Sequence, residues 1–313
     1  MRWLELAPGY ACNAACLGCH ACNADPQQQM AFEEVVRWLQ NARRHGAQHL
    51  WLSGGEPTLR KDFLGTLRAA RQFGYQRIKV QTNGMLFAYE HFAERAVAAG
   101  MNEASLLLRS LDPARHDALH RTQGGLRALQ QGLERLRATG IRLEGDVLLT
   151  ADTIGELPAI VRHYTDLGLR HFNLWLFSLA DQGDADLRAL VPRLTDAMPF
   201  ILEARTIAQQ QGATVCSLAS PHCTLPPHAW DLLFDAAGMD MLVVNPGGQA
   251  FKMEASRLEA GAFHEPCQTC AVRGWCHGLR PDYVSVHGTG ELRTLSEAEV
   301  AGFDPRGSVL DLP

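Results

Sequence analysis

The sequence predicts an α/β fold: a partial (β/α)6 TIM-like barrel followed by a small cysteine-rich α+β module. Three observations lead to this prediction. Short stretches rich in β-forming residues alternate with longer segments of helical period, which is typical of parallel strands joined by helices. A glycine follows each helical stretch, where positive φ commonly closes the last turn. Most of the nine cysteines fall into two groups, one near each end of the chain.

The barrel elements are expected in strict alternation. Predicted strands cover residues 3–6, 49–53, 77–81, 103–108, 142–150 and 171–176. Predicted helices cover residues 32–45, 59–73, 89–99, 126–138, 155–167 and 184–211. The closing glycines are Gly46, Gly74, Gly100, Gly140, Gly168 and Gly212. Six units with right-handed crossovers curl toward a barrel and leave it open.

After Gly212 the pattern changes. Prolines in residues 220–227 break regular structure, and residues 241–253 around Pro246-Gly247-Gly248 predict a β-hairpin. We therefore expect a barrel over 1–212, a cysteine-bearing module over 213–285 and a loosely packed tail over 286–313.

Composition limits the functional class. The chain has 313 residues, 46% of them hydrophobic and 20% charged, which is enough apolar material for a sizeable core. A formal net charge of −5 argues against a nucleic-acid partner. The chain shows neither an apolar secretion signal at its start nor a run of about 18 apolar residues, so we expect a cytoplasmic protein without a membrane segment.

The first cysteine group is Cys12, Cys16 and Cys19, spaced CxxxCxxC directly after the first predicted strand. Reduced cysteines at such spacing favour an iron–sulfur cluster or zinc. A four-iron cubane held by three cysteines keeps one iron open for a small ligand. Cys22 lies close by and is either a small buried hydrophobic residue, a catalytic hydrogen-atom donor or a partner of a second centre.

Polar and glycine-rich motifs follow the next three predicted strands. In Ser53-Gly54-Gly55-Glu56-Pro57 the glycines let the backbone approach a ligand, and the glutamate can accept a hydrogen bond from a cation. Thr82-Asn83-Gly84 ends the third strand, and Ser110-Leu111-Asp112 follows the fourth. The C-terminal ends of barrel strands are where a βα barrel places its chemistry.

Together these motifs resemble those of the radical S-adenosylmethionine (radical SAM) superfamily over about residues 1–180. The resemblance implies reductive cleavage of S-adenosylmethionine (SAM) to a 5′-deoxyadenosyl radical, hydrogen abstraction from a substrate, and a flavodoxin- or ferredoxin-type reductant. Gly18 stands where the family usually has an aromatic residue beside the adenine. The implied ligands of a [4Fe–4S] cluster are Cys12, Cys16 and Cys19, and the implied SAM contacts are Ser53, Gly54, Gly55, Glu56, Pro57, Thr82, Asn83 and Ser110.

The second cysteine group is Cys267, Cys270 and Cys276, spaced CxxCx5C, with Cys223 upstream as a fourth ligand. It resembles the twitch module, the shorter relative of the SPASM extension, and so implies one auxiliary [4Fe–4S] cluster. Arg280 stands where the longer SPASM pattern would place another cysteine. Zinc on the same four cysteines is the alternative, and spacing does not separate the two. Cys216 is left without a metal role.

Families with such modules often modify ribosomally made peptides, and others process small molecules. We therefore expect maturation of a peptide or oxidation of a small biosynthetic intermediate, with the auxiliary cluster transferring electrons. The alternative is a non-catalytic iron–sulfur electron carrier or a zinc-stabilised binding protein. The Gly54-Gly55-Glu56 turn favours the enzyme, because an electron carrier has no use for a methionine-binding turn.

Overall fold

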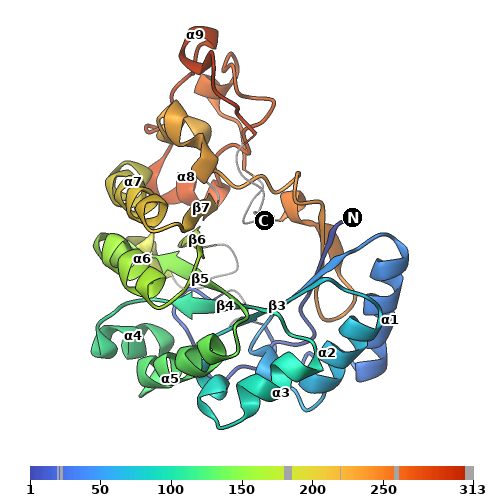
Figure 1. Ribbon diagram of the computed structural model, residues 1–313. Helices are drawn as coiled ribbons and strands as arrows, with labels where there is room; N and C mark the ends of the chain where they lie inside the picture. The colour runs from blue at the N-terminus through green and yellow to red at the C-terminus, as the bar shows by residue number, and fades with distance from the viewer. Residues whose placement is uncertain (20, 22–23, 180–184, 219, 257–260, 307–313) are drawn as a thin grey trace. The chain divides into compact units, whose positions relative to one another are not determined.

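The computed structural model describes residues 1–313 except 20, 22–23, 180–184, 219, 257–260 and 307–313 (Figure 1). Within this described part, the strands form one mostly parallel, nine-stranded sheet in the order β7-β6-β5-β4-β3-β2-β1-β8-β9. The strands are β1 (Trp3–Leu6), β2 (His49–Leu52), β3 (Arg77–Thr82), β4 (Glu103–Leu108), β5 (Arg142–Leu149), β6 (His171–Leu176), β7 (Thr214–Leu218), β8 (Met241–Val244) and β9 (Ala250–Lys252). The α-helices are α1 (Phe32–Arg44), α2 (Phe63–Gln72), α3 (Phe92–Ala99), α4 (Pro113–His120), α5 (Gly125–Ala138), α6 (Leu157–Asp166), α7 (Leu194–Gln210), α8 (Pro281–His287) and α9 (Glu297–Val300).

The predicted α/β class with a partial barrel is confirmed, and the small C-terminal cysteine-rich module stays a prediction. All six expected strands are present, each ending within a residue of its predicted bounds, and the six closing glycines all have positive φ. The expected helix over 184–211 is shorter, because α7 begins at Leu194, and residue 184 itself lies outside the described residues. Helix α4 and strand β7 were not predicted. Asp112 is the N-cap of helix α4, because its side chain accepts a hydrogen bond from the backbone amide of Arg115, so the Ser-Leu-Asp motif also precedes a helix.

The chain divides into two compact units, 1–146 with 240–252, and 147–239 with 253–313. In the first unit β1 pairs in parallel with β2 on one side, with Trp3 opposite His49, and with β8 on the other, with Leu4 opposite Leu242. The predicted hairpin is confirmed as the antiparallel pair β8–β9. Its first strand extends the sheet beside β1, an addition that local sequence did not indicate. The expected boundaries at 212 and 285 stay a prediction.

The two faces of the first unit's sheet differ in chemistry. Helices α1, α2 and α3 lie side by side (Figure 1). Alternate strand residues are apolar and fully buried, among them Leu4, Leu50 and Leu106. On the opposite face Lys79 Nζ lies 2.6 Å from Glu144 Oε2 and 3.3 Å from Glu103 Oε1. Charged and apolar residues therefore alternate along these strands.

Lys79 is a buried cation between the buried carboxyl groups of Glu103 and Glu144, and we predict that its removal is costly. Burial raises the pKa of Glu144 to about 8, even though Lys79 lies beside it. Lys79→Met leaves Glu103 and Glu144 facing each other without this cation, so we expect a loss of about 3–5 kcal/mol in the free energy of unfolding. Urea unfolding would measure it. Lys61→Met, at an exposed lysine of the same unit, is the matched control and should change stability by less than about 0.5 kcal/mol; an equal effect of the two variants would contradict the prediction.

The second unit contains α6, α7, β6 and β7, together with the described part of the expected tail. That part packs more closely than predicted: Leu295 is fully buried, and its carbonyl accepts a hydrogen bond of 2.9 Å from the amide of Ala271. Glu291 also accepts a hydrogen bond of 2.8 Å from the amide of Thr195 at the start of α7. Apolar residues at 292 and 295 carry this packing and are too widely spaced to show a period. Across the described residues, no helix has the length and apolar character needed to cross a membrane.

Candidate active site

The first three cysteines lie in the long loop between β1 and α1, which we call the cysteine loop (residues 7–31). Cys16 is buried, and burial raises the pKa of its thiol to about 12, although the charge of Arg109 acts in the opposite direction. Cys12 lies near the third-strand motif, with its Sγ 4.0 Å from Asn83 Nδ2. Cys22 and His20 lie outside the described residues.

Two strand-end residues hold the middle of the cysteine loop. Asn83 Nδ2 donates a hydrogen bond of 2.7 Å to Asn13 Oδ1, next to Cys12. Arg109 donates one of 2.7 Å to the carbonyl of Leu17, between Cys16 and Cys19. The end of α4 adds backbone hydrogen bonds, from the amide of Leu17 to the carbonyl of Leu119 at 2.8 Å and from Ala15 to His120 at 3.3 Å.

Arg60 binds both ends of the same loop. Its guanidinium donates to the carbonyl of Pro8 at 2.8 Å and to the carbonyl of Met30 at 3.0 Å. The same group forms an ion pair with Asp62, with 2.7 Å between Nη2 and Oδ2. A planar guanidinium with several donors suits such a bridge, because one side chain satisfies carbonyls from two segments. Arg60 was not among the predicted site residues, although it lies three residues beyond the Gly-Gly-Glu-Pro motif.

The Gly-Gly-Glu-Pro turn packs directly against the cysteine loop. The amide of Gly55 donates to the carbonyl of Gly9, and the amide of Glu56 to the carbonyl of Ala11, each at 2.9 Å. A Cβ added to Gly55 would lie 2.3 Å from the oxygen of Ala11. Gly54 has φ of +103°, which a side chain would strain. The two glycines are therefore required where the turn meets the loop.

Glu56 connects the turn to the end of β3. Its carboxylate is 2% exposed and accepts hydrogen bonds from Thr58, from Thr82 Oγ1 at 2.9 Å and from the amide of Asn83 at 2.8 Å. Burial raises the pKa of Glu56 above its usual value, while these hydrogen bonds lower it. The expected role of Glu56 as acceptor of the SAM ammonium group is a prediction; the structure assigns it the additional task of joining two motifs that are far apart in sequence.

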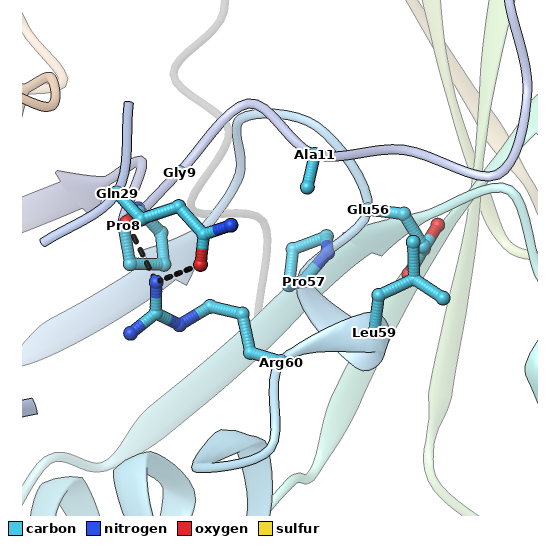
Figure 2. Close-up of a pocket in the computed structure, with 8 residues that line it drawn as sticks. All are labelled: Pro8, Gly9, Ala11, Gln29, Glu56, Pro57, Leu59 and Arg60. Carbon is cyan, nitrogen blue, oxygen red and sulfur yellow. Dashed lines mark hydrogen bonds between the residues drawn. The ribbon is translucent and has the colours of Figure 1, made fainter. Parts of the chain in front are cut away.

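A small pocket of about 40 Å³ lies between the turn and the cysteine loop (Figure 2). In Figure 2, Arg60 reaches toward Pro8 and Gln29 on the loop side, while Glu56 and Pro57 come from the turn. The lining residues are Pro8, Gly9, Ala11, Gln29, Glu56, Pro57, Leu59 and Arg60.

The remaining predicted contacts have partners within the chain. Ser53 Oγ donates to Glu5 Oε1 at 2.7 Å, and burial, as the largest cause, raises the pKa of Glu5. Ser110 Oγ accepts a hydrogen bond of 3.1 Å from the amide of Asp112. The role of Ser53 and Ser110 in binding SAM stays a prediction.

In the second unit, one small pocket of about 10 Å³ is lined by Cys223, Cys267, Cys270 and Cys276, together with Phe263 and Arg273 among others. Burial raises the pKa of the Cys223 and Cys276 thiols. Cys216 lies buried in β7 and is not among the residues of this cavity. Among the residues that the structure describes, no three histidine, cysteine, aspartate or glutamate side chains are close enough together to hold a single metal ion.

Arg280 has a structural role at the position where a SPASM module would carry a cysteine. Its guanidinium donates to the carbonyls of Leu176 at 3.3 Å and Phe177 at 3.0 Å, just at and beyond the end of β6. Asp282, 3.5 Å from Arg280, accepts a hydrogen bond of 2.8 Å from Ser178. This side chain therefore joins the cysteine-bearing segment to β6.

The fold and the site together define a class: an enzyme with a βα barrel that is partly formed and a three-cysteine loop at the C-terminal ends of its strands. Residues 6–163, half of the chain, match the family model of the radical SAM superfamily, and the chain belongs to that superfamily. The protein is therefore an enzyme. Family membership implies a [4Fe–4S] cluster and SAM as cofactors, and the three soft thiolates and the glycine cradle at Gly55 fit them.

Curated relatives match part of the chain. It is 28% identical over 172 residues to a probable GTP 3′,8-cyclase of Methanococcus maripaludis, covering 54% of this chain and 56% of that protein. A probable GTP 3′,8-cyclase of Methanopyrus kandleri is 27% identical over 169 residues, covering 53% and 54%. The chain thus spans about half the length of the curated relatives it matches.

Two solved structures show the fold. SuiB of Streptococcus suis bound to SAM superimposes with a TM-score of 0.64 at 16% identity, covering 80% of this chain and 59% of that one. Native anSMEcpe with bound SAM superimposes with a TM-score of 0.60 at 16% identity, covering 89% and 88%. At these identities the similarity concerns the fold alone.

Proposed function

We propose that this enzyme reductively cleaves SAM and uses the resulting radical to abstract a hydrogen atom from a peptide or a small biosynthetic intermediate. The observation that supports this most is the direct backbone bonding of the Gly-Gly-Glu-Pro turn to the cysteine loop, at Gly55 and Glu56. This contact joins the turn proposed to bind the methionine group to the loop segment directly before Cys12. The non-catalytic alternative is not retained, because the chain is an enzyme of the radical SAM superfamily.

In this proposal Cys12, Cys16 and Cys19 would hold the cluster. SAM would contact the turn at residues 53–57, together with Thr82, Asn83 and Ser110. When bound, the cluster and SAM together supply a 5′-deoxyadenosyl radical. The chain keeps the loop in place through the hydrogen bond from Asn83 to Asn13.

We further propose an auxiliary [4Fe–4S] cluster on Cys223, Cys267, Cys270 and Cys276. The shared cavity supports it, because it brings a cysteine from the segment after β7 together with three from residues 267–276. Thiolate sulfur is the ligand that iron–sulfur clusters and zinc both prefer, so metal analysis must separate the two. Four ligands leave no open iron, which favours electron transfer over substrate binding.

The comparisons point to two substrate classes. The neighbour structures include SuiB bound to the precursor peptide SuiA and anSMEcpe bound to the Cp18Cys peptide. The curated relatives are probable GTP 3′,8-cyclases, and their match favours a small-molecule substrate as the second candidate. A flavodoxin- or ferredoxin-type reductant and a cytoplasmic location are part of the proposal.

The direct test is anaerobic reconstitution with iron and sulfide, followed by reduction and addition of SAM. We expect about eight irons per chain, the content of two [4Fe–4S] clusters, and formation of 5′-deoxyadenosine. A fully iron-loaded protein that forms no 5′-deoxyadenosine would refute the proposed activity. Zinc in place of iron in the second unit would refute the auxiliary cluster.

A double variant tests the auxiliary cluster separately. Cys267→Ala/Cys270→Ala removes two of the four proposed ligands, so we expect iron to fall to about four per chain while SAM cleavage continues and product is lost. Iron analysis and quantification of 5′-deoxyadenosine and product would check this. Unchanged iron content would contradict the assignment of these cysteines as ligands, and unchanged product would contradict the electron-transfer role.

A further inference from the structure

The two ends of the cysteine loop meet at its base in a short antiparallel pairing. Gly9 and Gln29 form an isolated bridge, and the amide of Met30 donates a hydrogen bond of 2.8 Å to the carbonyl of Pro8. A two-stranded pairing of this size is marginally stable on its own in water. The closure of the loop therefore depends on what else holds these two segments together.

Arg60 lies across this pairing. Its Nη1 donates a hydrogen bond of 2.8 Å to the carbonyl of Pro8, and its Nη2 donates one of 3.0 Å to the carbonyl of Met30. Figure 2 shows the guanidinium reaching from the far side of the pocket toward Pro8. The side chain is only 11% exposed, and hydrogen bonds from a charged donor are stronger than those between neutral groups. One side chain thus holds both ends of the loop.

Asp62 fixes the orientation of this guanidinium. Its two carboxylate oxygens accept hydrogen bonds from Arg60, Oδ1 from Nε at 2.9 Å and Oδ2 from Nη2 at 2.7 Å. Asp62 is also the N-cap residue of α2, a position where an aspartate usually accepts a hydrogen bond from a helix amide. Here the side chain makes no such capping bond. The carboxylate serves Arg60 and not the helix, which indicates that the orientation of the guanidinium matters.

The Gly-Gly-Glu-Pro turn is attached to the same group of contacts from both sides. The carbonyl of Gly9, next to Pro8, accepts a hydrogen bond of 2.9 Å from the amide of Gly55. The backbone of Arg60 ends the short 3-10 helix Pro57–Leu59 that continues the turn, and its amide donates a hydrogen bond of 3.2 Å to the carbonyl of Pro57. Opening of the loop base therefore moves a carbonyl to which the turn is bonded.

We infer that Arg60, oriented by Asp62, is a positioning residue that couples closure of the cysteine loop to the geometry of the turn, so that the turn binds SAM well only while the loop base is closed. This inference rests on the proposed function. The planar guanidinium suits the task, because its donors point in fixed, different directions and reach two carbonyls and a carboxylate at once. A lysine ammonium concentrates its donors on one nitrogen and cannot span the same acceptors.

The test combines hydrogen exchange with equilibrium binding of SAM, both on the reconstituted full-length protein under anaerobic conditions. In Arg60→Met we expect the amides of Met30 and Gly55 to exchange about tenfold faster and SAM to bind about tenfold more weakly, the loss expected from removing charged hydrogen bonds. Exchange in α5 should not change, because the opening is local. Arg60→Lys should behave like Arg60→Met. Arg68→Met, at an exposed arginine of α2, is the matched control and should resemble the parent.

The Asp62→Ala variant provides a second, milder test that does not depend on how well Arg60→Met folds. We expect changes in the same direction but smaller, since the guanidinium remains and is only less well oriented. The double variant Arg60→Met/Asp62→Ala should match Arg60→Met alone in SAM affinity, because Asp62 acts on the loop through Arg60. Additive effects of the two substitutions on SAM affinity would overturn the inference.

Three other results would also overturn it. Full recovery of SAM affinity in Arg60→Lys would show that charge alone is needed. Faster exchange at Met30 with unchanged SAM affinity would show that the loop base and the turn are not coupled. Equally faster exchange in α5 would show a general loss of stability. A reconstituted parent protein that binds no SAM would instead refute the proposed function, while the exchange of Gly55 in Arg60→Met would still report the coupling.

Discussion

Replacing Cys16 by alanine is expected to reduce 5′-deoxyadenosine formation to background. Cys16 is the middle ligand of the proposed three-cysteine site, and its thiol is buried in the cysteine loop. Two thiolates cannot retain a cubane whose open iron must also bind SAM, so iron should fall from about eight to about four per chain. Anaerobic iron analysis and chromatography of the nucleoside products would measure both quantities.

Cys216→Ala is the control for that variant. Cys216 is a fully buried cysteine in β7, in the second unit, and is not among the residues that line the four-cysteine cavity. Its loss removes a small buried side chain at a modest cost in stability and should leave iron content and cleavage intact. Equal iron loss in the two variants would show that a general defect in folding, and not ligation by Cys16, explains the result.

Gly55→Ala is expected to eliminate SAM binding, because the added methyl group has nowhere to go. It would meet the oxygen of Ala11 at 2.3 Å and the carbonyl carbon and oxygen of Tyr10 at 2.6 Å. All three atoms belong to the backbone of the cysteine loop, so the loop or the turn must move. Forcing a methyl group into a packed site costs about 1–3 kcal/mol, and the displacement separates the turn from the cysteines.

Equilibrium binding of SAM to the reconstituted protein would measure this effect, and thermal unfolding would report its effect on folding. Gly290→Ala is the matched control, because a Cβ at Gly290 meets nothing within 4 Å and its φ is not positive. We expect this control to bind SAM like the parent. If Gly55→Ala also bound SAM with unchanged affinity, the turn would not be part of the SAM site.

Local signals in the sequence predicted the fold well. Each strand of the barrel units has a compact apolar stretch, and each predicted helix is closed by a glycine with positive φ, as Gly46 and Gly74 show. Both signals depend on neighbouring residues only. Strand β7 was missed because residues 214–218 are short and contain polar side chains, and their pairing with β6, as between Phe172 and Val215, is a long-range contact.

The residues of the site also fall into those that local sequence predicts and those that only the structure reveals. The cysteine spacing and the Gly-Gly-Glu-Pro turn are contiguous motifs, so their residues could be named in advance. Arg60 and Arg109 could not, because an isolated arginine is most often exposed and the sequence does not show what it faces. A signal was present for Arg109 in its position directly after three leucines at the end of a buried strand, where a charged residue is unusual.

The amino-acid order alone determined the α/β class, the two groups of cysteines and the resemblance to the radical SAM superfamily, because these depend on periodicity and spacing along the chain. Tertiary structure alone decided that Glu56 joins the turn to Thr82 and Asn83, that Arg109 lies against the cysteine loop, and that β8 pairs with β1. These contacts connect segments separated by many residues. These hydrogen bonds become necessary only when the sheet forms and its polar groups are buried. No local sequence pattern indicates which groups will then need a partner.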